Sequence, residues 1–153
     1  DLVNQIYEKI PHVSLTTDII VGFPGETHED YLETLDLVEK SRFEGAYTFI
    51  YSQRKGTPAA QYENDIPEKE AKERLYRLND LINEGFLRGN KRFEGRIVKV
   101  LVEGYSKTNE KVLSGYTENN KLVNIMGDES LIGNIIEVKI EKAKTWSLDG
   151  VVL

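Results

Sequence analysis

The sequence contains no cysteine among its 153 residues, which excludes disulfides, thiolate nucleophiles and thiolate-bound metals. Its two histidines, His12 and His28, are too few for a zinc site built from protein side chains alone. The longest apolar runs, residues 19–21 and 46–51, are too short to span a bilayer, and no basic segment precedes an apolar one as in a signal peptide. We therefore predict a cytoplasmic protein with no metal site and no membrane contact.

The overall composition, 39% apolar and 30% charged, is ordinary for a soluble globular protein and is compatible with one domain or two small ones. The net charge of −6 is unevenly distributed. Residues 1–89 carry 10 Lys and Arg against 17 Asp and Glu, whereas residues 90–153 carry 10 against 9. The second half is therefore the better candidate for binding a polyanion. The chain begins with Asp1 rather than Met, within an apparent helix, and we expect it to be part of a longer polypeptide.

The first half of the sequence alternates helical and strand patterns. In chain order, the expected elements are a helix over residues 2–10, a strand over 14–23, a helix from Thr27, a strand over 46–52 and a long helix from Pro67. This alternation predicts parallel strands joined by crossover helices, as in an α/β sheet or a (β/α) barrel.

Local patterns refine this prediction. A T-x-x-D capping box at residues 27–30 marks the start of the second helix. The apolar run at residues 19–21 indicates a strand buried on both faces. Tyr47, Phe49 and Tyr51 alternate along the next strand, and we expect this aromatic face to pack in the core.

The second half changes to β-rich patterns near Gly89. Five short strands are expected, over residues 96–103, 113–117, 122–126, 135–144 and 147–153. Their length and their Gly, Asn and Asp punctuation predict a small five-stranded antiparallel barrel. The predicted domains are residues 1–88, of the α/β class, and residues 89–153, of the all-β class.

Two loops follow the predicted parallel strands. Residues 22–26, with the sequence GFPGE, follow the first strand, and residues 52–57 follow the second. Parallel strands place such loops at the same edge, where ligands bind, and Arg54 in the second loop offers a planar fork for a carboxylate or phosphate. A nucleotide-like ligand fits this pattern, although neither a Walker loop nor a G-x-G-x-x-G fingerprint is present. The residues alone leave open that the first loop is only a tight turn before a capped helix.

Five stretches of this chain resemble, in order, the radical-SAM methylthiotransferases. They are TTDIIVGFPGET, FIYSQRKGTPAA, RLYRLNDLIN, GYTENNKLVNI and KAKTWSLDG. The last two are most similar to the members that add a methylthio group to an N6-isopentenylated adenosine beside the tRNA anticodon. The resemblance implies that residues 1–88 are the C-terminal part of a partial TIM-like (β/α) barrel. It also implies that residues 89–153 are a TRAM domain, a small barrel associated with RNA binding.

The resemblance implies S-adenosylmethionine and two [4Fe–4S] clusters as cofactors of the full-length enzyme. The cluster ligands are cysteines that this chain lacks, so they are expected in a missing N-terminal part of the same polypeptide, and this chain alone is expected to be inactive, with no catalytic residue. The residues implied to line S-adenosylmethionine are Ile20, Gly22, Phe23, Pro24, Gly25, Glu26 and Arg54. The family pattern G-x-I-x-G-x-x-E is matched inexactly, because Asp18 replaces its first glycine and Glu26 comes one residue late.

The TRAM resemblance implies tRNA, specifically the anticodon stem-loop, as the partner of the second half. The expected contacts are basic, amide and aromatic side chains: Arg92, Arg96, Lys99, Asn119, Asn120, Lys121, Lys144 and Trp146. Tyr116 is a second candidate for base stacking. The residues themselves also allow Trp146 to fill the barrel interior, and they allow residues 118–121 to be only a hairpin turn.

Two other functions remain compatible with the sequence. One is a related methylthiotransferase that acts on threonylcarbamoyl-adenosine in tRNA or on a ribosomal protein. The other is a non-catalytic RNA-binding module.

Overall fold

The computed structural model describes residues 2–107 and 109–153. Asp1 and Thr108 lie outside the described residues, and Thr108 falls in residues 105–112, which the sequence predicts to be a turn between the first two strands of the barrel. The chain divides into two compact units, one ending at Gly85 and the other formed by residues 86–153. This division and the predicted boundary at residues 88–89 both fall within the long helix α3 (Glu68–Lys91).

The first unit contains the predicted alternation of helices and strands. Its elements are α1 (Leu2–Lys9), β1 (Thr17–Val21), α2 (His28–Ser41), β2 (Ala46–Ile50), the 3-10 turn η1 (Pro58–Gln61) and most of α3. The capping box predicted at the start of α2 is confirmed: Asp30 N donates to Thr27 Oγ1 at 3.1 Å, and Thr27 N donates to Asp30 Oδ2 at 2.9 Å.

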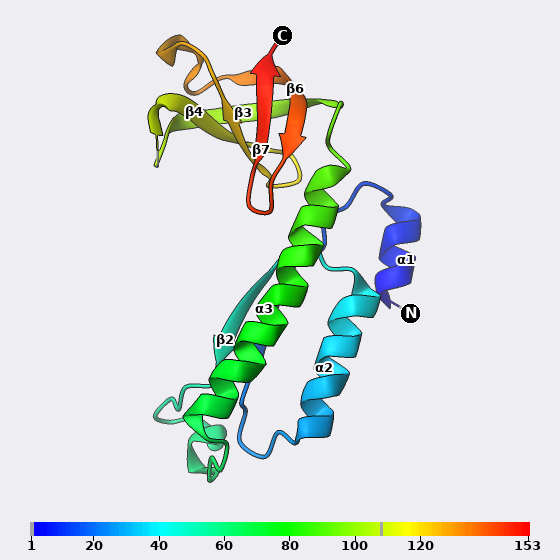
Figure 1. Ribbon diagram of the computed structural model, residues 1–153, viewed down its shortest axis with the longest axis vertical. Coiled ribbons are helices and arrows are strands. Elements are labelled where there is room, and N and C mark those ends of the chain that lie inside the picture. Colours follow the sequence, from blue (N-terminus) through cyan, green and yellow to red (C-terminus); the bar gives the residue numbers. More distant parts are fainter. Residues whose placement is uncertain (1, 108) are drawn as a thin grey trace. The chain divides into compact units, whose positions relative to one another are not determined.

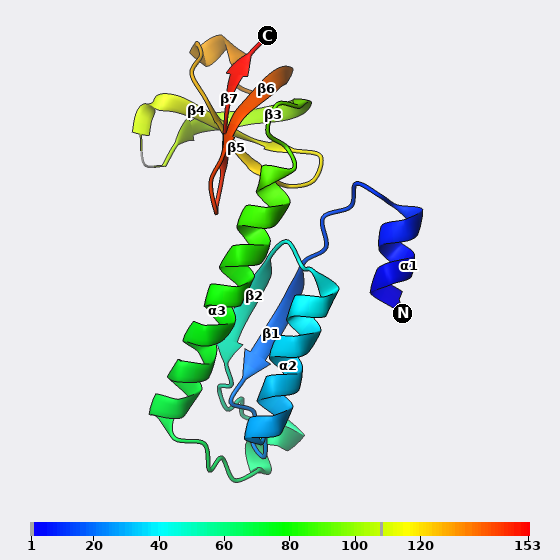
Figure 2. The same ribbon diagram turned by 45° about the vertical axis from the view of Figure 1, so that its right-hand side comes forward.

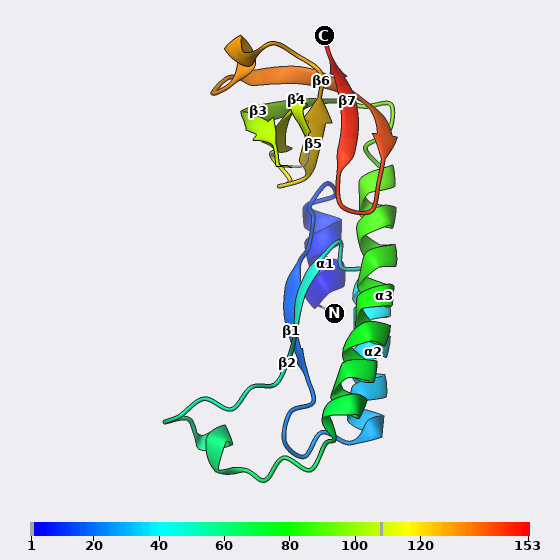
Figure 3. The same ribbon diagram turned by 60° about the vertical axis from the view of Figure 1, so that its left-hand side comes forward.

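The two strands pair in parallel, as predicted, with Val21 opposite Ile50. Helices α2 and α3 lie on the same side of this sheet (Figures 2 and 3). The side chains between the sheet and the helices form the core, in which Val21, Leu35 and Leu78 are buried. Thr48 on β2 adds a hydrogen bond of 2.5 Å to Asn79 on α3.

The opposite face of this sheet is open, which corrects two predictions. Ile20 is 53% exposed, so β1 is not buried on both faces, and Tyr47 and Phe49 are 74% and 52% exposed rather than packed in a core. Asp18 lies on the same face as these three side chains. The reason is that the described residues provide helices for one side of the sheet only, so the apolar pattern of the other side has no covering layer.

The second unit is a closed barrel of five strands (Figure 1). The strands are β3 (Ile97–Ser106), β4 (Asn109–Thr117), β5 (Leu122–Ile125), β6 (Ile135–Ala143) and β7 (Leu148–Val152), with the 3-10 turn η2 (Glu129–Leu131) before β6. Their order around the barrel is β3-β4-β5-β7-β6. The prediction of a five-stranded barrel is confirmed.

The prediction that this barrel is antiparallel throughout is wrong, because β5 and β7 pair in parallel, with Val123 opposite Leu148. The other four neighbouring pairs are antiparallel. An odd number of strands cannot alternate in direction around a closed ring, so at least one pair has to be parallel. The chain between β5 and β7 contains η2 and the whole of β6, which gives the long connection that parallel neighbours need in place of a tight hairpin.

The barrel interior is filled by alternating inward-facing apolar residues, which the strand periodicity predicts. The buried set consists of Phe93, Val100, Val102, Leu113, Val123, Ile125, Val138, Ile140 and Leu148. Gly115 permits close strand approach, since a Cβ atom there would lie 2.1 Å from the carbonyl oxygen of Leu101.

Candidate functional site

The loops that follow β1 and β2 meet at the carboxyl edge of the parallel sheet, as predicted. Tyr51 N donates to Val21 O at 2.9 Å, which extends the pairing past the strand ends. The rings of Phe23 and Tyr51 then contact each other edge to face, with 5.0 Å between their centroids. One aromatic side chain from each loop therefore joins the two segments.

The first loop turns at Pro24 and Gly25. Glu26 N donates to Phe23 O at 2.8 Å, and Gly25 has a φ of +82°. Proline followed by a residue with positive φ is the requirement of a type II turn. A Cβ on Gly25 would meet no atom within 4 Å, and Phe23 is 40% exposed, so the tip of this loop is open to a ligand.

Gly22 lies at the base of the same loop and faces the helix layer. Its φ is +70°, and a Cβ there would lie 3.2 Å from the Cβ of Ala71 on α3. Its N–H donates to Glu26 Oε1 at 3.1 Å. Gly22 therefore serves the turn and the packing against α3, and its N–H is already engaged.

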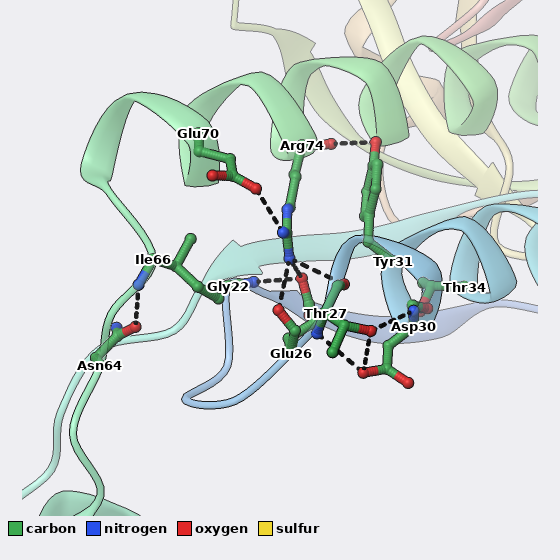
Figure 4. Close-up of polar contacts among 10 residues, drawn as sticks. All are labelled: Gly22, Glu26, Thr27, Asp30, Tyr31, Thr34, Asn64, Ile66, Glu70 and Arg74. Carbon is green, nitrogen blue, oxygen red and sulfur yellow. Dashed lines mark hydrogen bonds and ion pairs between the residues drawn. The ribbon is translucent and has the colours of Figure 1, made fainter.

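Glu26 and Arg74 form a buried ion pair that joins the loop to α3 (Figure 4). The side chains are 12% and 6% exposed. Arg74 Nη1 donates to Glu26 Oε1 and also to the backbone oxygens of Glu26 at 3.2 Å and Thr27 at 3.4 Å. Arg74 Nη2 donates to Glu70 Oε1 at 2.6 Å. We call this arrangement of Gly22, Glu26, Thr27, Glu70 and Arg74 the Arg74 clasp.

The two carboxylates of the clasp stabilise the positive charge of Arg74. Burial lowers the pKa of Arg74, but its hydrogen bonds to Glu26 and Glu70 outweigh this effect and raise the pKa above its ordinary value. The Tyr31 hydroxyl donates to Arg74 O at 3.0 Å, and the guanidinium carbon lies 5.4 Å from the centre of the Tyr31 ring. The first turn of α2, which carries Tyr31, is thus tied to the same point of α3.

The start of α2, directly after the clasp, is stabilised by hydrogen bonds between Thr27 and Asp30. Hydrogen bonds from the backbone and side chain of Thr27 lower the pKa of the Asp30 carboxyl group below its ordinary value. The side chain of Thr34 adds a bond of 3.1 Å to Asp30 O (Figure 4).

The second loop presents Arg54 at the protein surface. Thr57 N and Thr57 Oγ1 both donate to Arg54 O, at 3.2 Å and 2.8 Å, and Gly56 has a φ of +89° within this turn. The side chain of Arg54 is exposed and has no hydrogen-bonding or ionic partner within the described part of the chain. Its guanidinium is therefore available to an anionic ligand.

The seven residues expected around S-adenosylmethionine thus separate into residues that stabilise the loop and residues that a ligand can reach. Gly22 and Glu26 hold the loop in shape, whereas Ile20, Phe23, Pro24, Gly25 and Arg54 lie on the accessible side. Sequence reasoning missed Arg74. The sequence does contain a signal for it. Arg74 lies four residues after Glu70 and between the apolar residues Ala71 and Leu78, on a helix face where a buried charge needs a partner.

The candidate RNA-binding residues of the barrel fall in two groups. The first group comes from the segment between α3 and β3 and from the β6–β7 connection, which contacts the end of α3. Asn90 Nδ2 donates to the backbone oxygens of Lys144 at 2.8 Å and Thr145 at 3.0 Å. The rings of Trp146 and Phe86 also pack together, with 4.8 Å between their centroids. Trp146 nevertheless remains 62% exposed, so the alternative that it fills the barrel interior is wrong.

The cations of this first group differ in availability. Arg96 is exposed, whereas Arg92 is half-buried with its guanidinium 5.4 Å from the Phe93 ring centre. Lys144 pairs with Asp149 at 2.6 Å, and its side chain is 51% exposed.

The second group lies around the β4–β5 turn. Asn120 has a φ of +57° and donates its N–H to Thr117 O at 2.9 Å, which confirms the predicted hairpin turn. Asn119 and Lys99 line a hollow of about 320 Å³ together with Glu118 and Glu137. Lys121 is only 7% exposed, so its side chain belongs to the packing of the barrel rather than to its surface.

An apolar row on the outside of the barrel was not predicted. The strand register places Leu122, Tyr116, Leu101 and Ile135 side by side on β5, β4, β3 and β6. Tyr116, Leu101 and Ile135 are 37%, 43% and 69% exposed. Tyr116, the second stacking candidate, therefore lies within a continuous apolar strip.

Neither a cluster of metal-ligating side chains nor a membrane-spanning helix is present among residues 2–107 and 109–153. No group of three or more His, Asp or Glu side chains in these ranges could hold a metal ion. None of the helices described is both long and apolar enough to cross a membrane.

Residues 91–153 match the family model of the TRAM domain. The whole chain is similar to part of proteins named tRNA-2-methylthio-N(6)-dimethylallyladenosine synthase. The relative from Oceanobacillus iheyensis is 56% identical over 153 residues, which are 100% of this chain and 30% of that protein. The relative from Bacillus subtilis is 56% identical over 150 residues, 98% of this chain and 30% of that protein. The relative from Acetivibrio thermocellus is 55% identical over 150 residues, 98% of this chain and 31% of that protein. The chain thus spans less than a third of the length of these relatives.

Proposed function

We propose that this chain, a homologue of the C-terminal portion of the tRNA-2-methylthio-N(6)-dimethylallyladenosine synthases, belongs to an enzyme that adds a 2-methylthio group to N6-isopentenyladenosine beside the tRNA anticodon. The observation that carries the proposal is the 56% identity, which extends through both the α/β unit and the barrel. Similarity confined to the barrel would have supported RNA binding alone.

In this proposal the first unit is the end of a larger (β/α) barrel. Its two parallel strands have helices on one face, while the other face exposes Ile20, Tyr47 and Phe49. A barrel places its helices outside and its ligand at the carboxyl ends of the strands. The remaining part of the same polypeptide would cover the open face and continue the sheet.

The accessible loop residues fit one side of S-adenosylmethionine. Ile20 and Phe23 offer exposed apolar surface for the adenosyl group, and Gly25 allows close backbone approach because the space around it is empty. Arg54 offers a cation for the carboxylate of the methionyl part. When bound and reduced, S-adenosylmethionine supplies the reactive chemistry of this family, and the residues of this chain bind and orient it.

The residues of this chain do not fit the two [4Fe–4S] clusters of such an enzyme. The ligands of those clusters are cysteine thiolates, and the chain has no cysteine. Any cluster would therefore be held by the part of the polypeptide outside this chain, and we derive no catalytic step from the residues described.

The barrel is proposed to bind the anticodon stem-loop of tRNA. Trp146 offers an exposed ring for base stacking, Tyr116 offers a second ring, and Arg96 and Lys144 offer cations on the same unit. Proteins that bind single-stranded RNA combine such aromatic platforms with backbone-neutralising cations. Lys121 is excluded from this surface by its burial.

The test uses the full-length protein with reconstituted clusters and tRNA that carries N6-isopentenyladenosine. Arg54→Ala should lower the rate of methylthiolation more than it lowers tRNA affinity. Trp146→Ala should weaken tRNA binding by about tenfold, since a stacked base contributes on the order of 1–3 kcal/mol. Equal losses of rate and affinity in Arg54→Ala would instead give that residue a structural or RNA-docking role.

The substrate is tested in the same assay. Methylthiolation of threonylcarbamoyl-adenosine, or of a ribosomal protein, in place of the isopentenylated tRNA would assign the chain to a related transferase. Binding of tRNA without modification of any of these substrates would favour a non-catalytic RNA-binding role.

A further inference from the structure

Arg74 is buried, yet its guanidinium contacts four hydrogen-bond acceptors and one aromatic ring. These groups belong to three segments: the loop after β1, α2 and α3 itself. Arg74 is 6% exposed and donates to two carboxylates, those of Glu26 and Glu70, and to two backbone oxygens of the loop after β1. Its own backbone oxygen accepts from Tyr31 on α2. An exposed helix arginine could form the pair with Glu70, but it would not make the buried contacts to Glu26, to Thr27 and to Tyr31.

The clasp fixes both ends of the loop and leaves its tip free. At one end, Gly22 N donates to the same carboxylate oxygen of Glu26 that Arg74 contacts. At the other end, Arg74 holds the backbone oxygens of Glu26 and Thr27 (Figure 4). The tip between these points carries Phe23, the ring of which contacts Tyr51 in the second loop.

We propose that Arg74 is a positioning residue for S-adenosylmethionine: through Glu26 it holds residues 23–25 in the shape that receives the adenosyl group. This inference rests on the proposed function. It also assigns Glu26 a different role from the one that the family pattern implies, because its carboxylate acts on the loop and not on the ligand.

The geometry requires arginine rather than lysine. One guanidinium nitrogen serves the loop, and the other serves Glu70, which lies one helical turn earlier on α3. A planar fork provides these two directions at once, whereas a lysine ammonium is a single point charge on a flexible stem. Arg74→Lys is therefore expected to keep the positive charge but to lose the loop geometry.

The experiment compares variants of the full-length protein in a double-mutant cycle. Arg74→Met, Glu26→Gln and the combined variant are measured for the equilibrium dissociation constant of S-adenosylmethionine, for tRNA affinity and for amide-hydrogen exchange of residues 22–27 without ligand. Arg77→Met is the matched control, because Arg77 is an exposed arginine three residues further along α3 and makes no hydrogen bond or ion pair with the described loop residues.

Each of the three variants should weaken S-adenosylmethionine binding by a similar factor of about ten, because small displacements of positioning groups are costly and the two residues act as one unit. Exchange of residues 22–27 should accelerate, while tRNA affinity and the Arg77→Met control remain unchanged. The combined variant keeps the test valid if Arg74→Met alone folds poorly, since it removes both buried charges together.

Two outcomes would overturn the role of Arg74. One is a further loss of affinity when Glu26→Gln is added to Arg74→Met, because Glu26 would then contact the ligand directly. The other is lowered thermal stability of Arg74→Met with unchanged ligand affinity and unchanged loop exchange. Failure of the unsubstituted full-length protein to bind S-adenosylmethionine would overturn the proposed function as well, and it is distinguishable because it does not depend on any variant.

Discussion

A single carboxylate oxygen, Glu26 Oε1, accepts hydrogen bonds from both Gly22 N and Arg74 Nη1. Both charged side chains are largely buried, so Arg74 is the counter-charge of Glu26 at the base of the loop, while Glu70 is a second, more exposed counter-charge of Arg74. Removing one partner leaves the second charge in a poorly solvated site, which costs more than removing both.

The stability of single and double variants should reflect this pairing. We expect Arg74→Met to lower the free energy of unfolding by about 3 kcal/mol, since the loss of one member of a buried pair typically costs 3–5 kcal/mol. The combined Arg74→Met and Glu26→Gln variant should recover part of this loss. Urea denaturation followed by circular dichroism measures both values. Additive losses in the combined variant would show that the two side chains are energetically independent.

The capping box makes a pH-dependent contribution at Asp30. Because its pKa is lower in the folded state than in the unfolded state, the stabilisation by Asp30 is present above the unfolded value of about 3.9 and is lost as pH falls through the folded value. Carbon-detected NMR titration of the Asp30 carboxyl group should give a pKa below the ordinary range. In Thr27→Ala, which removes one hydroxyl donor, this pKa should rise. The rise should be partial, because the backbone N–H of residue 27 still donates to Asp30, and an equal pKa in both proteins would contradict a contribution from the Thr27 hydroxyl.

At the scale of elements, the sequence predicted which segments are helices and strands but not which strand faces are covered. Periodicity and caps are local, so α2, α3 and the barrel strands were identified from neighbouring residues. Whether Tyr47 or Thr48 faces the helices depends on which layers are present, and no local pattern contains that information. The clasp was missed for the same reason, because Glu26 and Arg74 are 48 residues apart.

The approach of β3 and β4 at Gly115 gives a stability prediction for the barrel. An added Cβ would lie 2.1 Å from Leu101 O and 2.9 Å from Val100 Cγ1, so the strands would have to separate. Gly115→Ala should therefore lower the free energy of unfolding by about 1–3 kcal/mol or more, the usual cost of overpacking. Gly104→Ala on β3 is the control, because a Cβ there meets no atom within 4 Å. Thermal unfolding of the two variants should differ clearly, and equal melting temperatures would contradict the steric argument.

At the scale of the whole molecule, the open face of the α/β sheet is the largest departure from the predicted burial. Ile20, Tyr47 and Phe49 are more than half exposed on this face, and Phe23 is 40% exposed at the edge next to it. Exposed apolar patches of this kind mark surfaces that another segment covers or that drive association. The sequence predicted that residues 1–88 are only part of a larger barrel, but it also predicted that both faces of β1 are buried, and this chain covers only one of them.

Association of the isolated chain tests this surface. We expect this chain, expressed alone, to self-associate with increasing concentration, because burying one large apolar side chain contributes about 1.5–3 kcal/mol. Replacing Tyr47 and Phe49 by serine should shift the chain toward monomer in sedimentation-velocity experiments. Leu2→Ser is a suitable control, since Leu2 is 71% exposed but lies on α1. Identical sedimentation of all three proteins would show that the open face does not drive association.

The parallel pair of β5 and β7 also determines when the barrel can be completed during synthesis. Until β7 is available, the four earlier strands form an open sheet in the order β5-β4-β3-β6, with unpaired backbone groups along β5 and β6. Strand β7 pairs with both of these edges at once, through Val123–Leu148 on one side and Val138–Val152 on the other. The barrel therefore remains an incomplete sheet during synthesis until its last strand is available, and the RNA-binding surface proposed for it is complete only after β7 has paired with both edges.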